Sequence, residues 1–156
     1  MGDKIKKPIR IKDWTKPIPD PEGRFVGLPM AVEFIDGVNW RLNHAMSYHT
    51  EASETSTVKA GFVFDFASVP RWLAWLYPAA GDGESLYGLA SLWHDWLYCH
   101  RKIGDRPITR KEADDLFYEI MRYLGVSWWT ASRMYRAVRV FGWLPWGQRR
   151  PEDITP

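Results

Sequence analysis

The sequence contains a single cysteine, Cys99, and this scarcity excludes two classes of small protein. One cysteine cannot form a disulfide within the chain, and it cannot supply the several thiolates of a cysteine-rich zinc site. The 156 residues must instead be held together by a hydrophobic core, for which a chain of this length is sufficient. We therefore expect residues 1–156 to form one domain, made in a reducing compartment.

Long hydrophobic runs are also missing. The apolar stretch at residues 72–77 is far shorter than the ~20 residues that a membrane span needs. Lys4, Lys6 and Lys7 lie near the start of the chain, but no apolar run follows them, so we expect no signal peptide. The sequence predicts a soluble protein without a transmembrane segment, cytoplasmic on synthesis in its host cell.

Neither sign of charge is in large excess. The chain has 21 Lys and Arg against 19 Asp and Glu, a net charge of +2, and the two signs are interspersed. This balance gives no electrostatic reason to expect nucleic acid as a partner. What the sequence has in abundance is tryptophan, with ten residues, which indicates large buried aromatic side chains or contact surfaces.

The N-terminal part of the chain predicts strands. Residues 1–22 are rich in proline and are expected to form an extended arm. Strand-like runs at 24–35 and 38–47 flank Asp36-Gly37, a pair typical of tight hairpin turns. After an exposed polar tract at 49–57, residues 57–64 resemble a third strand. Residues 23–66 should thus form a small antiparallel sheet.

The rest of the chain, residues 70–142, predicts helices. A short helix should begin at Pro70, and three longer ones fall between Ser85 and Phe141. Thr109 and Glu112 form a capping-box pattern at the start of the second long helix. We expect an α+β fold, with a three-helix region following the sheet and an irregular tail at 143–156. Gly125 and Gly142 are predicted to end the second and third long helices, and Ser127 is predicted to cap the third. The second helix has a predicted buried face made of Ala113, Leu116, Phe117, Ile120 and Leu124. The apolar residues of the third include Ala131, Met134, Tyr135, Val138 and Phe141.

A small set of ionisable residues lies on the first two long helices. His94 and Tyr98 are four residues apart and share a helix face, with Asp95 about 100° away. Asp114 lies near the apolar stripe of the second helix, so antiparallel packing would bring it to His94. A carboxylate there would fix the imidazole tautomer and favour a general base. Asp95 offers an oxygen ligand suited to a hard cation such as calcium.

Each of these residues also has a simpler interpretation. A buried histidine is often a core residue with satisfied hydrogen bonds, and an aspartate beside an apolar stripe is often a capping or ion-pairing residue. Tyr98 alone is a typical core residue. The combination favours a site, because charge buried in a Trp- and Leu-rich segment is unfavourable unless it has a purpose.

Three motifs stand out in the helical region: His94-Asp95-x-x-Tyr98, Ala113-Asp114-Asp115-Leu116-Phe117-x-x-x-Met121 and Ala131-x-x-x-Tyr135-x-Ala137-Val138-x-x-Phe141-Gly142. Together they resemble the catalytic helices of the phospholipase A2 superfamily, in particular its bacterial and fungal branch. The resemblance implies that His94 is the general base that activates water, that Asp95 binds calcium, and that Tyr98 and Asp114 support the histidine. The family's disulfides and the glycine-rich calcium loop of its animal members are absent.

Upstream of these helices, Asp65-Phe66-Ala67-Ser68 occupies the place of the family's calcium loop. Asp65 is therefore a second candidate calcium ligand. The alternative is ordinary helix N-capping by Asp65 or Ser68 before Pro70. A Ser68–His94 nucleophile pair is disfavoured, because no G-x-S-x-G pattern surrounds the serine.

Two functions follow from these patterns. The first is a phospholipase A2-like hydrolase that attacks an ester carbonyl of a phospholipid or another ester, with calcium as cofactor. The second is a non-enzymatic phage virion or assembly protein that retains the helices as a scaffold and binds phage structural proteins. From the strand pair through Gly61-Phe62-x-x-Asp65-Phe66-Ala67-Ser68-Val69-Pro70 to the His94-Asp95 helix, the chain as a whole resembles an uncharacterised domain family of phage and bacterial genomes. This resemblance implies a phage genomic setting and no established activity. Association with the virion is the expectation that belongs to the second function.

Overall fold

A computed structural model describes residues 18–36, 39–64 and 84–148 of the chain. Several predicted features lie outside these residues: most of the extended arm, the turn residue Gly37, the candidate ligand Asp65 with Ser68, the helix expected at Pro70, and the end of the tail. The architecture below concerns the described residues alone.

The N-terminal part of the structure consists of six short strands in two three-stranded antiparallel sheets. One sheet has the order β1-β4-β5 and the other has the order β2-β3-β6. The prediction of antiparallel strands is thus confirmed, although the strands are divided between two sheets. The strands are β1 (Phe25–Val26), β2 (Val32–Asp36), β3 (Asn39–Leu42), β4 (Met46–His49), β5 (Thr55–Val58) and β6 (Val63–Phe64).

The long strands expected from the sequence are each broken into two, and glycines mark two of the breaks. Gly27 has a φ of +94°, and a Cβ there would lie 2.7 Å from the carbonyl oxygen of Ala45, so only glycine fits this close approach. Gly61, with a φ of +84°, separates β5 from β6, which pair in different sheets. The polar tract at 49–57 is also not wholly a loop, because Thr55 begins β5 and pairs with His49.

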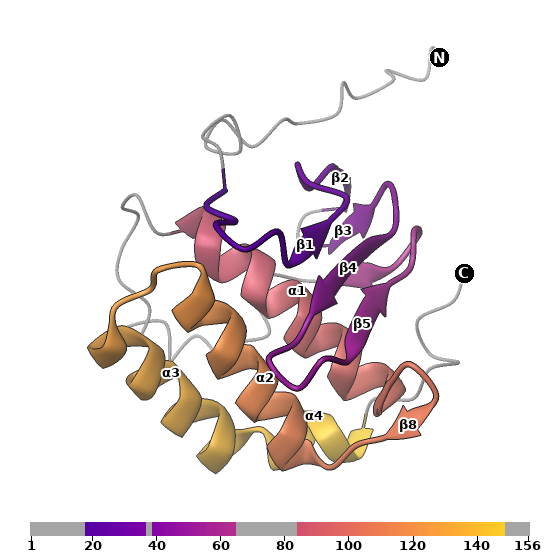
Figure 1. Ribbon diagram of the computed structural model, residues 1–156. Coiled ribbons are helices and arrows are strands. Elements are labelled where there is room, and N and C mark those ends of the chain that lie inside the picture. Colours follow the sequence, from indigo (N-terminus) through magenta and orange to yellow (C-terminus); the bar gives the residue numbers. More distant parts are fainter. Residues whose placement is uncertain (1–17, 37–38, 65–83, 149–156) are drawn as a thin grey trace.

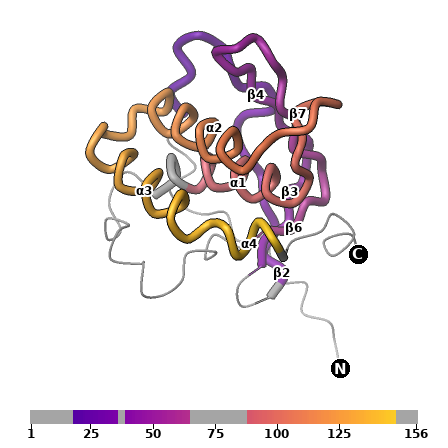
Figure 2. Tube along the Cα trace, turned by 90° about the horizontal axis from the view of Figure 1, so that it is seen from below, coloured from indigo at the N-terminus to yellow at the C-terminus, as the bar shows by residue number. Residues whose placement is uncertain are grey.

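Four helices follow, and a small hairpin connects the first two. Helices α1 and α2 lie side by side and run antiparallel, and α3 lies on the far side of α2 from α1 (Figures 1 and 2). The predicted α+β fold is therefore confirmed. None of the described helices is long and apolar enough to cross a membrane. The bounds are α1 (Glu84–His100), β7 (Lys102–Ile103), β8 (Arg106–Pro107), α2 (Arg110–Tyr123), α3 (Trp128–Phe141) and α4 (Trp143–Gln148).

Helix α1 is the centre of the hydrophobic core. Trp93 is fully buried, and its ring packs edge-on against Phe25 of β1, with 5.5 Å between the ring centroids. One turn later, Trp96 packs against Phe62 at 5.1 Å. Leu89, Trp93 and Leu97, which share one face of the helix, are all fully buried. The strand region covers α1 on one side, and α2 lies against it on another.

The start and end of α2 follow the sequence prediction. Thr109 accepts a hydrogen bond from the backbone N–H of Glu112, and the Glu112 carboxylate accepts one from the Thr109 backbone N–H. This is the predicted capping box. Gly125 has a φ of +87° just after the helix, as expected for a glycine stop. Ser127 caps α3 through the backbone N–H of Thr130.

Helix α3 ends at Phe141 with Gly142 as its C-cap, which confirms the predicted stop at this glycine. Gly142 has a φ of −71°, so it is not required for a left-handed turn. A Cβ there would instead collide with the Tyr98 hydroxyl and the Val138 carbonyl oxygen, so this position requires glycine for steric reasons. The chain then continues into α4, where an irregular tail was expected. Phe141, one of the apolar residues of α3, is 39% exposed.

Helix α4 is anchored to α1 by its tryptophan. The Trp146 ring packs edge-on against Tyr98, with centroids 5.1 Å apart. Arg101, just after α1, donates to the Trp146 carbonyl oxygen and lies over the Trp146 ring. The tail of the chain therefore contributes to the surroundings of Tyr98.

Candidate functional site

The candidate site is centred on Asp114 of α2, a carboxylate with no solvent exposure. Its Oδ1 lies 2.8 Å from Nε2 of His94 and accepts a hydrogen bond of 2.6 Å from the Tyr98 hydroxyl. Both partners belong to α1. The predicted contact between His94 and Asp114, with Tyr98 on the same carboxylate, is confirmed.

Packing holds the His94 ring in place. The imidazole lies between the rings of Tyr98 and Phe117, with centroid distances of 4.1 Å and 4.7 Å. Phe117 is one turn beyond Asp114 on α2, so a single face of α2 supplies both the carboxylate and an apolar wall. The His94 side chain is 12% exposed, so the histidine is largely buried.

Two arginines bind the other oxygen of the carboxylate, and the sequence interpretation missed both. Arg139 of α3 donates from Nη1 to Asp114 Oδ2 at 2.8 Å, and Arg110 Nη1 lies 3.5 Å from the same oxygen. The four-residue spacing of Arg110 and Asp114 on one helix could have revealed the Arg110–Asp114 pair. No local pattern reveals the Arg139–Asp114 pair, because Arg139 lies 25 residues from Asp114 on another helix.

The electrostatics keep Asp114 ionised. Burial by itself would raise the pKa of Asp114, but hydrogen bonds from His94, Tyr98 and Arg139 outweigh it and hold the pKa below its ordinary value. The same arrangement raises the pKa of Tyr98 through burial and through its bond to the carboxylate. The tyrosine therefore remains a neutral donor at physiological pH.

An ionised Asp114 accepts hydrogen bonds but cannot donate one. The contact at 2.8 Å therefore requires His94 to carry a proton on Nε2, and the neutral ring then has its lone pair on Nδ1. This is the tautomer that a general base would use, with a carboxylate orienting the ring and stabilising its protonated form.

The predicted calcium ligands are not brought together by the described residues. Asp95 is 5% exposed on α1, and Asp65 lies outside the described part of the chain. Within the described ranges, no group of three or more His, Cys, Asp or Glu side chains could hold a metal ion. Calcium takes six to eight oxygen ligands. Asp95 alone therefore does not make a calcium site.

The other three histidines do not share this arrangement. His44 Nε2 lies 2.6 Å from the Gly27 carbonyl oxygen, and His49 contacts Thr55. His100 stacks on Trp96, and burial lowers the pKa of His100, with Lys59 and Lys102 nearby.

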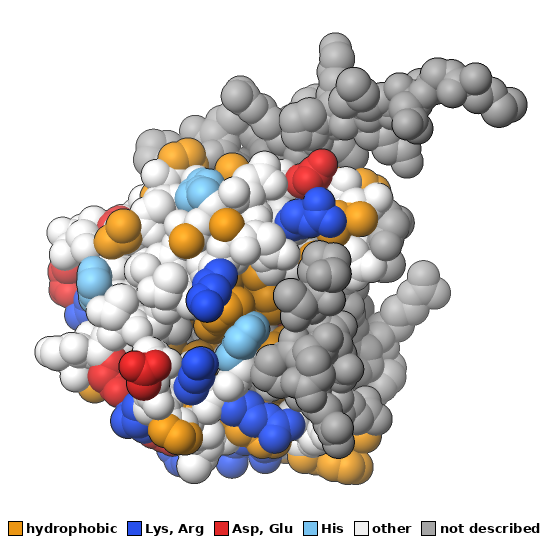
Figure 3. Space-filling view, turned by 90° about the vertical axis from the view of Figure 1, so that its right-hand side faces the viewer, with side chains coloured by type: hydrophobic (Ala, Val, Ile, Leu, Met, Phe, Trp, Pro, Cys, Tyr) orange, Lys and Arg blue, Asp and Glu red, His pale blue; other side chains and the backbone are white. Residues whose placement is uncertain are grey.

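Lysine and arginine side chains lie around an apolar recess on the face shown in Figure 3. In the part of the chain that the structure describes, His94 is the histidine bound to a carboxylate.

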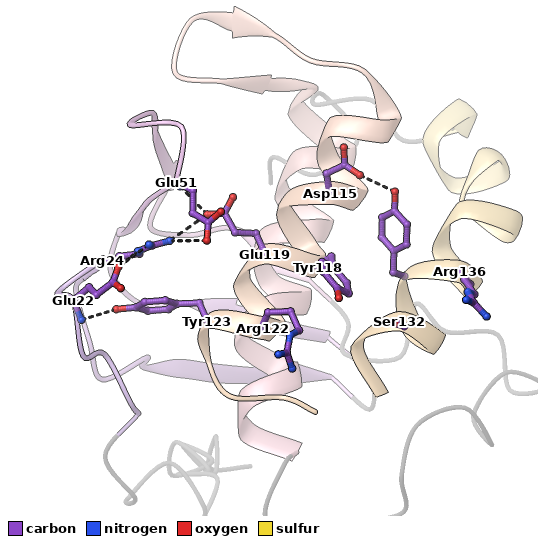
Figure 4. Close-up of a pocket in the computed structure, with 11 residues that line it drawn as sticks. Glu22, Arg24, Glu51, Asp115, Tyr118, Glu119, Arg122, Tyr123, Ser132 and Arg136 are labelled. Atoms are coloured by element: carbon purple, nitrogen blue, oxygen red, sulfur yellow. Dashed lines mark hydrogen bonds and ion pairs between the residues drawn. The ribbon is translucent and has the colours of Figure 1, made fainter. Parts of the chain in front are cut away.

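A groove of about 800 Å³ lies along the exposed side of α2, and it does not include His94, Tyr98 or Asp114. In Figure 4, Arg24 points toward Glu51 and Glu119 on one side of the groove. On the other side, the Tyr135 hydroxyl of α3 donates to Asp115 Oδ1 at 2.7 Å. Arg24 is thus paired with Glu51 and Glu119, and Asp115 accepts from Tyr135 and Lys111, so these charged groups of the groove already have partners. The lining residues are Glu22, Arg24, Glu51, Asp115, Tyr118, Glu119, Arg122, Tyr123, Ser132, Tyr135 and Arg136.

Comparison with known proteins places the chain in a family without assigning it an activity. No curated protein and no solved structure matches it. A family model described as "Protein of unknown function (DUF1353)" matches residues 40–138, which include His94, Tyr98 and Asp114 and most of the described strands and helices. This match covers more than half of the 156 residues, and the chain therefore belongs to the DUF1353 family.

Proposed function

We propose that this protein is an ester hydrolase in which His94 is the general base and Asp114 orients it. The observation that carries the proposal is the 2.8 Å contact between His94 Nε2 and the buried, ionised Asp114. That contact fixes the tautomer with a basic Nδ1, and the rings of Tyr98 and Phe117 fix the plane of the imidazole. Tyr98 and Asp114 are positioning residues, since they act through His94.

The proposed reaction is the attack of water on an ester carbonyl. His94 Nδ1 takes a proton from water while the water oxygen bonds to the carbonyl carbon, giving a tetrahedral intermediate. The carbon–oxygen bond to the alcohol then breaks, and the proton on Nδ1 passes to the departing alkoxide. The products are a carboxylic acid and an alcohol, and the imidazole returns to its neutral form. Asp114 stabilises the imidazolium that exists between the two transfers.

A phospholipid is the proposed substrate, on the basis of the motif positions shared with the phospholipase A2 superfamily. Calcium is the proposed cofactor on the same basis, with Asp95 and Asp65 as its ligands. When bound beside an ester, calcium would supply positive charge for the oxyanion. Because the described residues contribute only Asp95, the mechanism above routes no step through the metal.

The test is hydrolysis of phospholipids and simpler esters by the wild type and by His94→Gln, each with and without calcium. Glutamine keeps an N–H for Asp114 but has no basic nitrogen, so we expect the rate to fall by about 10²–10⁴-fold with little change in stability. Equal rates for the two proteins, or no measurable hydrolysis by the wild type of any ester, would refute the hydrolase.

A second function is supported by the two arginines. Arg139 and Arg110 already balance the charge of Asp114, and together with His94 they connect α1, α2 and α3 through one carboxylate. Such a network suits a scaffold, and we propose a non-enzymatic phage virion or assembly protein as the alternative. In that case His94→Ala should destabilise the fold by several kcal/mol, on the order of the cost of the cavity left between Tyr98 and Phe117 and of the lost hydrogen bond to Asp114, with no activity to lose.

A further inference from the structure

The outer surface of α3 and α4 carries most of the large hydrophobic side chains that the described residues expose. Trp129 is 73% exposed and Trp143 is 64% exposed, values that exclude a role in the core. Helix α3 lies at the edge of the helical layer away from the strands (Figures 1 and 2). The exposed side chains of this surface are Trp128, Trp129, Val140, Phe141, Trp143 and Leu144.

These side chains alternate with arginines along one face. Trp129, Arg133, Arg136 and Val140 are spaced by four, three and four residues, so they lie in one row along α3, and both arginines are exposed. The row extends about 16 Å from Trp129 to Val140 at 1.5 Å per residue. Arg139 points elsewhere, to Asp114.

The charged residues that α3 and α4 themselves contribute are all positive, although Arg136 also lines the α2 groove, which contains Glu22, Glu51, Asp115 and Glu119. Residues 127–148 contain three arginines and no aspartate or glutamate, although the whole chain has 19 acidic residues. The surface formed by the exposed row of α3 and by α4 is therefore both apolar and positively charged, which calls for a partner that is apolar and negatively charged.

We propose that this surface binds the headgroup region of an anionic phospholipid bilayer. Tryptophan rings favour the level of the lipid headgroups, and exposed arginines are attracted to anionic lipids while their stems lie along the apolar layer. A protruding helix ridge fits a deformable flat surface, whereas a protein would need matching pockets. A second copy is disfavoured because a two-fold interface uses the same patch on both subunits, which would bring two positively charged patches together.

The proposal does not depend on the hydrolase, and it is tested without turnover. Vesicles of an ether-linked phosphatidylglycerol, which has no ester to hydrolyse, are sedimented with the protein beside vesicles of ether-linked phosphatidylcholine. We expect the wild type to bind the anionic vesicles, to bind them less at high salt, and to bind phosphatidylcholine weakly. No binding to either, or equal binding to both, would overturn the proposal.

Two pairs of substitutions locate the surface. Arg133→Gln with Arg136→Gln should weaken binding to the anionic vesicles by ~30-fold, and Trp129→Ser with Trp143→Ser should weaken it by ~10-fold or more. All four side chains are exposed, so thermal melts should match the wild type. Wild-type binding by both pairs would assign the vesicle contact to another surface and refute the proposal.

Matched controls lie on the strands and the small hairpin. Lys59→Gln with Lys102→Gln removes two exposed positive charges, and Val26→Ser removes a hydrophobic side chain that is 55% exposed. These variants should bind the anionic vesicles as the wild type does, and an equal loss of binding in them would refute the assignment of the surface.

Sedimentation equilibrium of the wild type is run in parallel. A dimer that Trp129→Ser with Trp143→Ser abolishes would assign the surface to a second copy.

Discussion

Asp114 is the residue on which the proposed site depends. It is fully buried, yet its two oxygens accept from a histidine, a tyrosine and an arginine on two other helices. A buried carboxylate without these partners would become protonated, because desolvation disfavours its charge. The hydrogen bonds from these donors keep Asp114 ionised. The ionised carboxylate in turn fixes the orientation of each donor side chain.

The lowered pKa of Asp114 predicts how stability depends on pH. In the folded protein Asp114 binds fewer protons than in the unfolded chain, so its contribution is present above the ordinary pKa of 3.8 and is lost as the pH falls below it. Asp114→Asn cannot titrate. The stability difference between wild type and Asp114→Asn, measured by urea unfolding, should be largest at neutral pH and should shrink in acid. A difference that stays constant with pH would contradict the lowered pKa.

Arg139 should contribute to stability through Asp114. Arg139→Gln removes the charged donor at Oδ2 and leaves the buried carboxylate with Arg110 as its nearest cation, so we expect a loss of about 1–3 kcal/mol. Arg133→Gln, an exposed arginine on the same helix, is the matched control and should be neutral. Thermal melts compare the two, and equal melting temperatures would mean that Arg139 does not support the carboxylate.

At the scale of the elements, the helices are positioned by their ends. Thr109 fixes the start of α2 through the capping box, and Asp114 lies only five residues further along the same helix. Gly142 allows the end of α3 to approach Tyr98 of α1. Both ends therefore determine where the partners of the site lie.

The cap of α2 predicts a local stability loss. Thr109→Ala removes the hydroxyl that accepts from Glu112 N–H, which should destabilise the protein by about 0.5–2 kcal/mol. Thr109→Ser keeps the hydroxyl and should retain most of the stability. The two variants are compared by chemical unfolding, and identical stabilities would show that the cap contributes little.

Gly142 predicts a link between the end of α3 and the site. Gly142→Ala would place a methyl group against the Tyr98 hydroxyl, which donates to Asp114 at 2.6 Å. We expect a lower melting temperature, together with a lower rate in any ester that the wild type hydrolyses. Gly147→Ala is the control, because a Cβ at Gly147 has open space around it. Equal melting temperatures and equal rates for Gly142→Ala and Gly147→Ala would show that the steric contact between position 142 and Tyr98 has no effect.

At the scale of the whole molecule, local signals in the sequence predicted the helices better than the strands. The capping box and the buried stripe of α2 depend on residues within one helix, and the structure has both. The division of the strands into two sheets depends on close approaches such as that of Gly27 to Ala45, which no local pattern contains. The same holds for the site: the spacing of His94 and Tyr98 and antiparallel packing were enough to predict Asp114, whereas Arg139 comes from a helix whose placement the sequence does not specify.

The calcium prediction depends on residues that the described structure does not bring together. If Asp95 and Asp65 bind calcium, calorimetry should detect weak binding that Asp95→Asn abolishes. Absence of binding at millimolar calcium, or unchanged binding by Asp95→Asn, would remove calcium from the proposed reaction while leaving His94 and Asp114 unaffected.

The protonation of the His94 ring is the most direct test of the whole account. Nitrogen NMR of ¹⁵N-histidine-labelled protein, with His94→Gln to assign the signal, distinguishes the two neutral tautomers. We predict that neutral His94 carries its proton on Nε2, facing Asp114 at 2.8 Å, and that Asp114→Asn weakens this preference. A neutral His94 with its proton on Nδ1 would contradict the account, because Nδ1 could not then accept a proton from water.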